Sequence, residues 1–359
     1  MLDEFGGAEQ VLKAFIDVFP DFELFTGFYN PKIVYRYFPE LNKHNLHTTL
    51  AQGTALEIHG PTFQALSPLL WRQFSFRSFD FILSNSSYIC ANLVNAFGKK
   101  HVQYILSVPK NVFQLDPKAP LQKIFPYHLY LQPYYKRVVR SSPYIITISE
   151  HTKKIIDSLF QISSTVIYPP ADIPKYIPPK KTNGDYFLCV SRLDPSKNLE
   201  LPILACTKLG LPLKIVGGGR VPKYETYLRS LAGHTVEFLG PKTSGDAREM
   251  NALHKNAKAF LLSSKSEDFG IAPVEAMGRG LPVIAYHGGG PKETVIPGKT
   301  GMFFYEHTPE SLMEILRQFN PNNFSVDVLY RHARKFRKEI FKKKLDTYIT
   351  GALRTSSVA

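Results

Sequence analysis

The sequence has little cysteine and no long apolar run. Only three of its 359 residues are cysteine, Cys90, Cys189 and Cys206, and their spacing fits no metal site. We expect them to be reduced, mostly buried thiols of a cytoplasmic protein. No run of ~18 apolar residues occurs, so no membrane-spanning helix is predicted. The opening residues, MLDEFGGAEQ, lack a basic segment followed by an apolar one, so we expect no signal peptide.

Acidic residues are also few compared with basic ones. There are 30 Asp and Glu residues against 44 Lys and Arg residues, which gives a formal net charge of +14. This charge suits nucleic acid, an anionic membrane surface or a phosphorylated small substrate, and it also suits a basic surface that is merely solvated. Hydrophobic residues make up 44% of the chain, which indicates a globular protein, and the length predicts two domains.

A proline-rich segment divides the chain near its middle. Residues 168–185 read YPPADIPKYIPPKKTNGD, and proline removes backbone donors and disfavours helix at the preceding residue. We therefore predict an extended linker between an N-terminal domain, 1–175, and a C-terminal domain, 182–332. The segment 333–359 is predicted to be a C-terminal helix that packs back on the N-terminal domain.

The second half alternates apolar runs with helical patterns. Strands are predicted at 186–193, 211–219, 236–240, 257–264 and 282–286. Helices are predicted between them, one capped by Asn198 and stopped by Gly210, and another beginning at Pro273. This alternation predicts an α/β domain with a doubly wound parallel sheet.

The first half has the same rhythm, with one irregularity. Strands are predicted at 23–29, 79–86, 100–108 and 144–149, but the helix over 6–19 follows almost directly on Met1. In a doubly wound sheet a central first strand delivers the chain to such a Gly-rich turn. We therefore expect the first strand of this domain to be missing and the true reading frame to begin upstream.

Two basic residues lie where the first strand of the second half ends. In VSRLDPSKNLE (190–200), Arg192 ends the strand and Lys197 precedes a helix. Parallel strands direct their carboxyl ends at the ligand crevice, where two fixed cations and unpaired helix N–H groups suit a diphosphate. Two ordinary surface bases are the alternative.

Two acids flank a glycine turn in SSKSEDFGIAPVEAMGRGLP (263–282). Glu267 is predicted to lie at the crevice rim, and Glu275 in the first turn of a helix whose position N1 is Pro273. Each carboxylate can accept hydrogen bonds from the adjacent hydroxyls of a diol, such as a sugar or a ribose. A helix-dipole partner is the alternative for Glu275. Phe269, Gly270 and Ile271 would present backbone N–H groups.

Two glycine-rich turns follow strands in the same half. IVGGGR (215–220) allows close backbone approach but lacks the third glycine of a dinucleotide fingerprint, so hydride transfer is disfavoured. GGGPKETV (288–295) precedes a helical pattern and fits the same crevice.

Together these features resemble family 4, or group 1, of the retaining glycosyltransferases, which have the GT-B fold of two Rossmann-like domains facing a central cleft. The resemblance rests on Arg192, Lys197, glycines 217–219, FLG (238–240), the Glu267-x7-Glu275 pair and GGGPKE. The first half resembles the O-antigen mannosyl- and rhamnosyltransferase branch in GGAEQVL (6–12), FDFILSNSS (79–87), VVRSSPYIITISEHTKKII (138–156) and VIYPPAD (166–172).

The resemblance implies a role for each matched residue. Arg192 and Lys197 would bind the donor diphosphate as leaving group, Glu267 the sugar hydroxyls, and Glu275 the ribose. The remaining predicted donor contacts come from backbone, at Phe269, Gly270, Ile271, Gly217, Gly218, Gly6 and Gly7. It implies no metal and no cofactor, with a GDP- or UDP-linked sugar as substrate, GDP-mannose by resemblance.

One segment departs from the branch. A His-x-Pro-x-Arg-like segment is usual after the fourth strand, and here Ser107, Val108, Pro109 and Lys110 stand in its place. Serine cannot replace an imidazole as a proton acceptor near neutral pH. His59 or His101 is a candidate substitute, with a structural role as the alternative.

Two segments suggest contact with a membrane. YHLYLQPYYKRVVR (127–140) mixes tyrosines with basic residues, and 330–349 is predicted to be one basic helix. We therefore expect a cytoplasmic hexosyltransferase, peripheral on the inner face of the plasma membrane, that transfers sugar to a lipid-linked or glycan acceptor in cell-surface polysaccharide synthesis. The alternatives are a degenerate GT-B protein that binds donor without transfer, a GT-B nucleotide-sugar epimerase, and a nucleic-acid binder.

Overall fold

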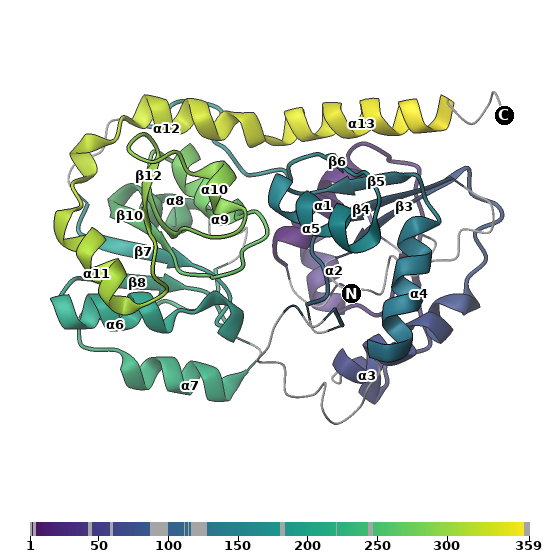
Figure 1. Cartoon of the computed structure of the whole chain (residues 1–359), viewed down its shortest axis with the longest axis horizontal. Coiled ribbons are helices and arrows are strands. Elements are labelled where there is room, and N and C mark those ends of the chain that lie inside the picture. Colours follow the sequence, from purple (N-terminus) through teal and green to yellow (C-terminus); the bar gives the residue numbers. More distant parts are fainter. Residues whose placement is uncertain are drawn as a thin grey trace. The chain divides into compact units, whose positions relative to one another are not determined.

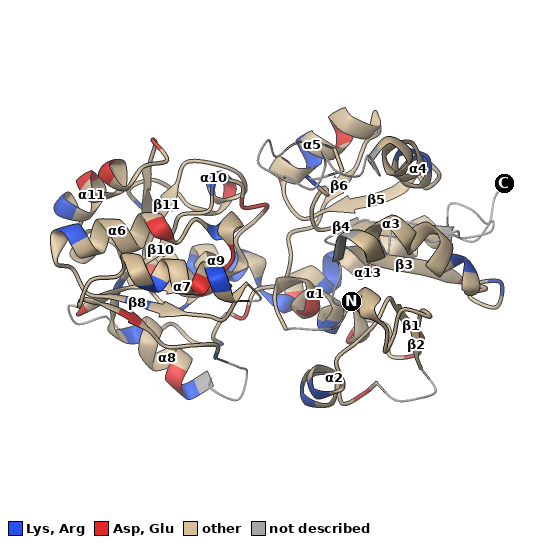
Figure 2. Cartoon of the chain, turned by 90° about the horizontal axis from the view of Figure 1, so that it is seen from below, with Lys and Arg blue, Asp and Glu red and all other residues tan. Residues whose placement is uncertain are grey.

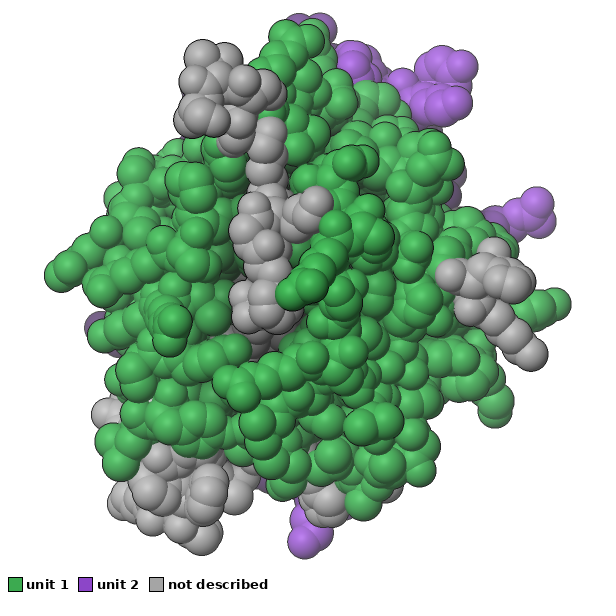
Figure 3. Space-filling view, turned by 90° about the vertical axis from the view of Figure 1, so that its right-hand side faces the viewer, with its two compact units in different colours: residues 1–170, 339–359 green, residues 171–338 purple. Residues whose placement is uncertain are grey.

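A computed structural model describes residues 2, 5–41, 45–57, 60–86, 100–110, 112–113, 115, 128–179, 184–219, 221–242 and 247–354. The chain divides into two compact units (Figures 1 and 3). Unit 1 comprises residues 1–170 and 339–359, and unit 2 comprises residues 171–338. The border at 170/171 falls inside the proline-rich segment.

Unit 2 is built on a six-stranded, wholly parallel sheet. Its strands are β7 (Tyr186–Val190), β8 (Leu213–Val216), β9 (Val236–Phe238), β10 (Ala257–Leu262), β11 (Val283–Tyr286) and β12 (Gly301–Phe304). The order is β12-β11-β10-β7-β8-β9. The chain therefore winds outward from β7 in one direction and restarts at β10 in the other. Such a reversal between neighbouring strands is where doubly wound sheets bind their ligands.

Helices connect these strands, and two more helices follow the last strand (Figure 1). They are α6 (Glu200–Leu209), α7 (Pro222–Leu231), α8 (Ala247–Asn256), α9 (Ile271–Gly278), α10 (Pro291–Thr294), α11 (Pro309–Gln318) and α12 (Val326–Ala333). Gly210 ends α6 in the left-handed conformation, with φ 62°, as predicted. The sequence therefore marks the end of this helix correctly.

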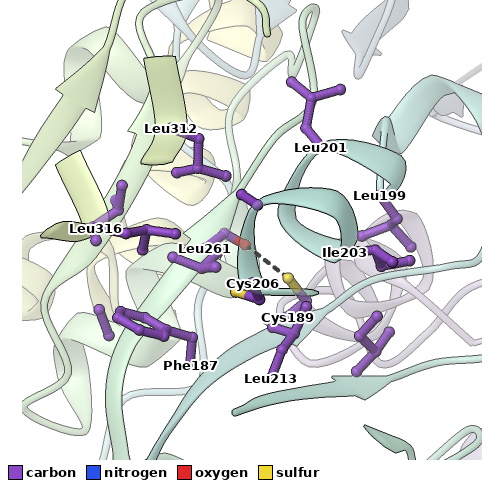
Figure 4. Packing of buried hydrophobic residues seen from close by; sticks show 14 of the residues in the cluster. Phe187, Cys189, Leu199, Leu201, Ile203, Cys206, Leu213, Leu261, Leu312 and Leu316 are labelled. Carbon is purple, nitrogen blue, oxygen red and sulfur yellow. Dashed lines mark hydrogen bonds between the residues drawn. The ribbon is translucent and has the colours of Figure 1, made fainter. Parts of the chain in front are cut away.

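The core of unit 2 is apolar and encloses two of the cysteines (Figure 4). Cys189 on β7 and Cys206 on α6 pack among Leu213, Ile203 and Leu261. The Cys189 thiol donates a hydrogen bond to the Leu261 carbonyl at 3.5 Å. Burial raises the pKa of the Cys206 thiol to about 12 and that of Cys189 further still. Both are buried free thiols, as predicted, whereas Cys90 lies outside the described residues.

The described strands of unit 1 form two separate parallel sheets. One has the order β3-β4-β5-β6 and the other pairs β1 with β2. The strands are β1 (Leu24–Thr26), β2 (Leu46–Thr48), β3 (Phe81–Ser86), β4 (Lys100–Ile105), β5 (Tyr144–Thr147) and β6 (Thr165–Val166). The helices are α1 (Gly7–Ile16), α2 (Pro31–Tyr37), α3 (Gly60–Leu70), α4 (His128–Arg140) and α5 (Glu150–Phe160). The predicted upstream strand stays a prediction.

The C-terminal segment forms two helices, α12 and the longer α13 (Lys338–Arg354), not the single one predicted over 330–349. A 3-10 turn, Arg334–Phe336, follows α12, and extended backbone at Arg337 (ψ 157°) breaks the helix before α13. Phe341 on α13 packs on Phe15 and Tyr104 of unit 1, with ring centroids 6.0 and 5.9 Å apart. Because the helix is broken at Arg337, Phe336 packs on Phe269 in unit 2, whereas Phe341 belongs to the core of unit 1.

Candidate functional site

The candidate donor site of unit 2 is built at the carboxyl ends of β7 and β10. These strands are neighbours at the point where the winding of the sheet reverses. The loop after β7 carries Arg192 and Lys197, and the loop after β10 carries Glu267. The sheet thus brings Glu267 to the same edge as Arg192 and Lys197, from which it is about 70 residues away in the sequence.

Hydrogen bonds hold the lysine loop against the end of β10. The Ser263 hydroxyl donates to the Lys197 carbonyl at 2.9 Å, and the Ser264 hydroxyl donates to the Ser196 carbonyl at 3.0 Å. Asn198 does not cap α6 as predicted. It adopts a left-handed conformation, with φ 51°, and its side-chain oxygen accepts the Lys265 N–H at 3.2 Å. The lysine loop is therefore fixed by three contacts from one short segment.

Lys197 and Glu267 form an ion pair. The Lys197 Nζ lies 2.7 Å from Glu267 Oε2, and the side chains are 23% and 16% exposed. A charge-assisted hydrogen bond in this partly desolvated setting is stronger than an exposed ion pair. Arg192 is exposed at the same strand end. The edge thus presents one exposed guanidinium beside a lysine whose charge is balanced by a carboxylate.

The glycines of GGGPKE pack against the backbone of the Glu267 loop. Gly290 donates its N–H to the Glu267 carbonyl at 2.8 Å. A Cβ on Gly289, where φ is 62°, would lie 2.1 Å from that oxygen. Only glycine combines this conformation with so close an approach. These glycines therefore set the position of Glu267.

The glycines after β8 have a similar structural use. A Cβ on Gly217 would lie 1.7 Å from the Ser191 carbonyl oxygen, and Gly218 accepts the Leu193 N–H at 2.9 Å. The turn thereby packs on the arginine loop. The predicted donor contacts of Gly217 and Gly218 stay predictions, but the chain needs glycine at 217 for its own packing.

Helix α9 begins two residues earlier than predicted. Gly270, with φ 90°, is its N-cap and Ile271 is position N1, so Pro273 is N3 and Glu275 lies beyond the first turn. The earlier start is possible because the N–H groups of the first turn have no partner in the helix, so proline is tolerated at N3. The Phe269 side chain is buried against Phe336.

Glu275 belongs to a network that the sequence does not reveal. Its Oε1 accepts the Asp172 N–H at 3.0 Å. Arg279, four residues further along the chain, donates Nη1 to the Asp172 carbonyl at 2.8 Å and Nε to Asn251 Oδ1 at 2.9 Å, and its Nη2 pairs with the Asp172 carboxylate. The four-residue spacing of Glu275 and Arg279 is the signal that could have identified Arg279.

The unit 1 candidates lie at the start of α1 and in the loop after β4. Gly6 precedes α1 and donates its N–H to Glu9 Oε2 at 2.9 Å, and Gly7 begins the helix. Ser107, after β4, donates its hydroxyl to the Val108 carbonyl at 3.3 Å. The predicted donor contacts of Gly6 and Gly7 stay predictions.

His101 is not a substitute for the absent histidine. It lies near the start of β4, at the opposite end of the strand from Ser107, and is buried. Its Nε2 lies 2.8 Å from Ser84 Oγ, and burial lowers its pKa to about 4. A buried histidine of this kind serves packing. His59, the other candidate, lies outside the described residues.

Neither metal ligands nor a membrane span is evident over the described part of the chain. Among those residues, no group of three or more His, Cys, Asp or Glu side chains could hold a metal ion. Likewise, none of the described helices is long and apolar enough to cross a bilayer.

Residues 174–339 match the family model described as "Glycosyl transferases group 1". This range covers nearly all of unit 2. Unit 2 is therefore similar to the group 1 glycosyl transferases, in agreement with the resemblance found in the sequence. The match includes Arg192, Lys197, Glu267 and Glu275, although it assigns none of them a role.

Two curated relatives are mannosyltransferases. The human "Alpha-1,3/1,6-mannosyltransferase ALG2" is 30% identical over 235 residues, 56% of either chain. The "GDP-mannose-dependent alpha-(1-6)-phosphatidylinositol monomannoside mannosyltransferase" of Mycolicibacterium smegmatis is 30% identical over 196 residues, 46% of this chain and 50% of that protein. The chain thus spans about half the length of these relatives.

A solved structure extends the likeness to the whole fold. The apo form of the lipopolysaccharide outer core galactosyltransferase WaaB is 21% identical, with a TM-score of 0.66, and covers 98% of this chain and 97% of that chain. The fold is therefore GT-B, as predicted, with two Rossmann-like α/β domains.

Proposed function

We propose that the protein is a retaining hexosyltransferase that moves a sugar from a nucleoside diphosphate donor to a lipid-linked or glycan acceptor. The observation that carries this proposal is the Lys197–Glu267 pair, held 2.7 Å apart at the reversal point of a doubly wound sheet. A cation and a carboxylate at one site suit the two halves of such a donor. The ammonium suits the diphosphate, and the carboxylate suits the sugar hydroxyls.

The chemistry follows from these roles. The bond between sugar C1 and the phosphate oxygen breaks while a bond from C1 to the acceptor oxygen forms on the same face. Arg192 and Lys197 stabilise the charge that develops on the leaving diphosphate, and its oxygen takes the acceptor proton. Fixed cations supply this stabilisation, so we propose transfer without a metal ion. Glu275 holds the ribose, and backbone of 269–271, Gly217, Gly218, Gly6 and Gly7 lies near the donor.

The proposal extends to the donor and to the acceptor. GDP-mannose is the proposed donor because two relatives that are 30% identical are named as mannosyltransferases, and one of them is named as GDP-mannose-dependent. A lipid-linked acceptor would require the protein to work at the inner face of the plasma membrane, from the cytoplasm.

The test is release of nucleoside diphosphate from GDP-mannose and from a panel of UDP- and dTDP-sugars, with and without a lipid-linked acceptor. We expect release that depends on acceptor with one donor, and its loss in Glu267→Ala. Glu310→Ala is the matched control, because Glu310 also pairs with a lysine, Lys208, at 2.9 Å but is exposed. Unchanged transfer by Glu267→Ala would refute the site.

A second candidate is a protein that binds donor without transferring it. Ser107, in place of the usual histidine, favours this candidate, because no described side chain on β4 supplies the missing imidazole at that end of the strand. Donor binding without any release in the same assay would identify it. A GT-B epimerase would instead convert the sugar without releasing free diphosphate.

A further inference from the structure

Helix α4 has one buried face and one exposed face. Leu131, Tyr135 and Val139 are buried in the core of unit 1. The opposite face begins with Leu129, 68% exposed, and Tyr130, 44% exposed. Positions 129, 133, 136, 137 and 140 follow one another at helical spacing along this face. The exposed face therefore begins apolar and continues toward the basic last turns of the helix. The basic residues of α4 are coloured blue in Figure 2.

The basic end of this face lines a hollow. A shallow depression of about 590 Å³ is lined by Pro133, Lys136, Arg137, Arg140 and Ser141. Arg140 is fixed at the rim because its Nε donates to the Phe160 carbonyl at 2.8 Å. The lining contains three cationic side chains and no acidic one among the described residues. Such a hollow suits phosphate groups.

The apolar end is extended by the neighbouring helix α3. The Tyr130 hydroxyl donates to the Ala65 carbonyl, so α4 and α3 meet at this pair of residues. On α3, Leu66 is 38% exposed and Leu69 is 61% exposed. Three exposed leucines therefore lie on two adjacent helices. Exposed aliphatic side chains in such a group indicate a surface that is covered in function.

We propose that this surface, made of Leu66, Leu69, Leu129, Tyr130, Lys136, Arg137 and Arg140, binds an anionic lipid bilayer. The leucines would enter the boundary between headgroups and acyl chains, Tyr130 would lie at the headgroup level, and the three cations would pair with lipid phosphates. A nucleic acid would also attract the cations, but it would leave the leucines exposed to water. A lipid bilayer would contact both the leucines and the cations of this surface.

The basic C-terminal helix is a poorer candidate for the same contact. Phe341, Leu345 and Ile349, three of its apolar residues, are buried in unit 1. Lys343 and Lys344 are exposed, but no exposed large apolar residue accompanies them on α13 among the described residues. Stable binding to a bilayer generally takes an apolar as well as an electrostatic contribution.

The test is sedimentation with vesicles of phosphatidylcholine alone or with about one third phosphatidylglycerol, a composition that sets a surface potential. We expect binding only to the anionic vesicles. Lys136→Gln/Arg137→Gln should lower the partition coefficient about 30-fold, from roughly 1 kcal/mol per basic residue. The matched control, Lys343→Gln/Lys344→Gln, removes the same charge from α13 and should change binding by less than about threefold.

A second pair of variants isolates the apolar part. Leu129→Ser should lower the partition coefficient about tenfold, and Leu50→Ser, at a loop residue that is 79% exposed, should leave it unchanged. All replaced side chains are at least partly exposed, and thermal unfolding verifies that each variant is folded.

Several outcomes would overturn the proposal. One is equal binding to neutral and anionic vesicles. Another is an equal loss of vesicle binding in the α4 double variant and the α13 double variant. The third is tighter binding to single-stranded RNA than to anionic vesicles. The inference rests on the proposed function in one respect: a lipid-linked acceptor would require the protein to bind a membrane. Vesicle binding is measured without donor or acceptor, so a failure here is distinct from a failure of the transfer assay.

Discussion

The Lys197 Nζ lies 2.7 Å from the Glu267 Oε2, although 70 residues separate the two in the sequence. Each residue is held by contacts of its own, Lys197 through the Ser263 hydroxyl and Glu267 through the Gly290 N–H. The pair therefore joins two independently fixed loops. A diphosphate that binds Lys197 must compete with the Glu267 carboxylate or displace it.

Removing the carboxylate should strengthen binding of the nucleoside diphosphate product. Glu267→Gln frees the Lys197 ammonium from its partner and removes a negative charge near the phosphates, so we expect affinity for the diphosphate to rise ~3–10-fold. Lys197→Met should lower it at least tenfold. Titration calorimetry measures both, with Glu310→Gln as the control that should change nothing. A loss of affinity in Glu267→Gln would show that the carboxylate helps to bind the diphosphate.

Arg279 should not tolerate replacement by lysine. Its guanidinium makes hydrogen bonds to Asp172 and Asn251 at once, and a lysine ammonium cannot reproduce that fork. We expect Arg279→Lys to cost about 1–3 kcal/mol of unfolding free energy. Asp172 also donates its N–H to Glu275, the proposed ribose contact. We therefore expect the donor KM to rise in Arg279→Lys and kcat to change less.

The matched control is Arg331→Lys. Arg331 is exposed and pairs with Asp327 one helical turn away, so its replacement should cost less than about 0.5 kcal/mol. Chemical denaturation measures both variants. Equal costs at the two positions would show that the network around Asp172 contributes little.

The sequence predicts the donor half of the site because its signals are local. Strand ends, Gly210 and the Glu267-x7-Glu275 pair are all visible within short windows. The order of the strands in unit 2 brings the carboxyl ends of β7 and β10 to one edge. The start of α9 is missed by two residues, because proline at N3 is as acceptable as at N1. The partners of Glu275 are missed because Asp172 lies 103 residues away. A contact between residues so far apart in the sequence cannot be predicted from local spacing.

Gly289→Ala should be more damaging than the same change at Gly210. Both glycines have φ 62°, so both variants suffer the same backbone strain of about 1 kcal/mol. A Cβ on Gly210 meets nothing within 4 Å, whereas one on Gly289 would lie 2.1 Å from the Glu267 carbonyl oxygen. We expect Gly289→Ala to cost at least about 2 kcal/mol more and to weaken donor binding. Equal melting temperatures would refute this assignment.

His101 should make the protein sensitive to acid. Burial lowers its pKa from 6.5 to about 4, so the folded chain favours the neutral ring. Between these values the unfolded chain binds the proton more readily, and stability therefore falls as the pH falls, by up to about 1.4 kcal/mol per pH unit. Above pH 7 the ring is neutral in both states and contributes no slope.

The measurement is the unfolding free energy of the wild type and of His101→Gln from pH 4 to pH 8. Other groups contribute to both curves, so the difference between them isolates His101. We expect the two curves to run parallel above pH 7, whatever the offset caused by the replacement itself. Below pH 6.5 the wild type should lose stability faster than the variant. Curves that stay parallel down to pH 4 would show that the ring is accessible to protons in the folded chain.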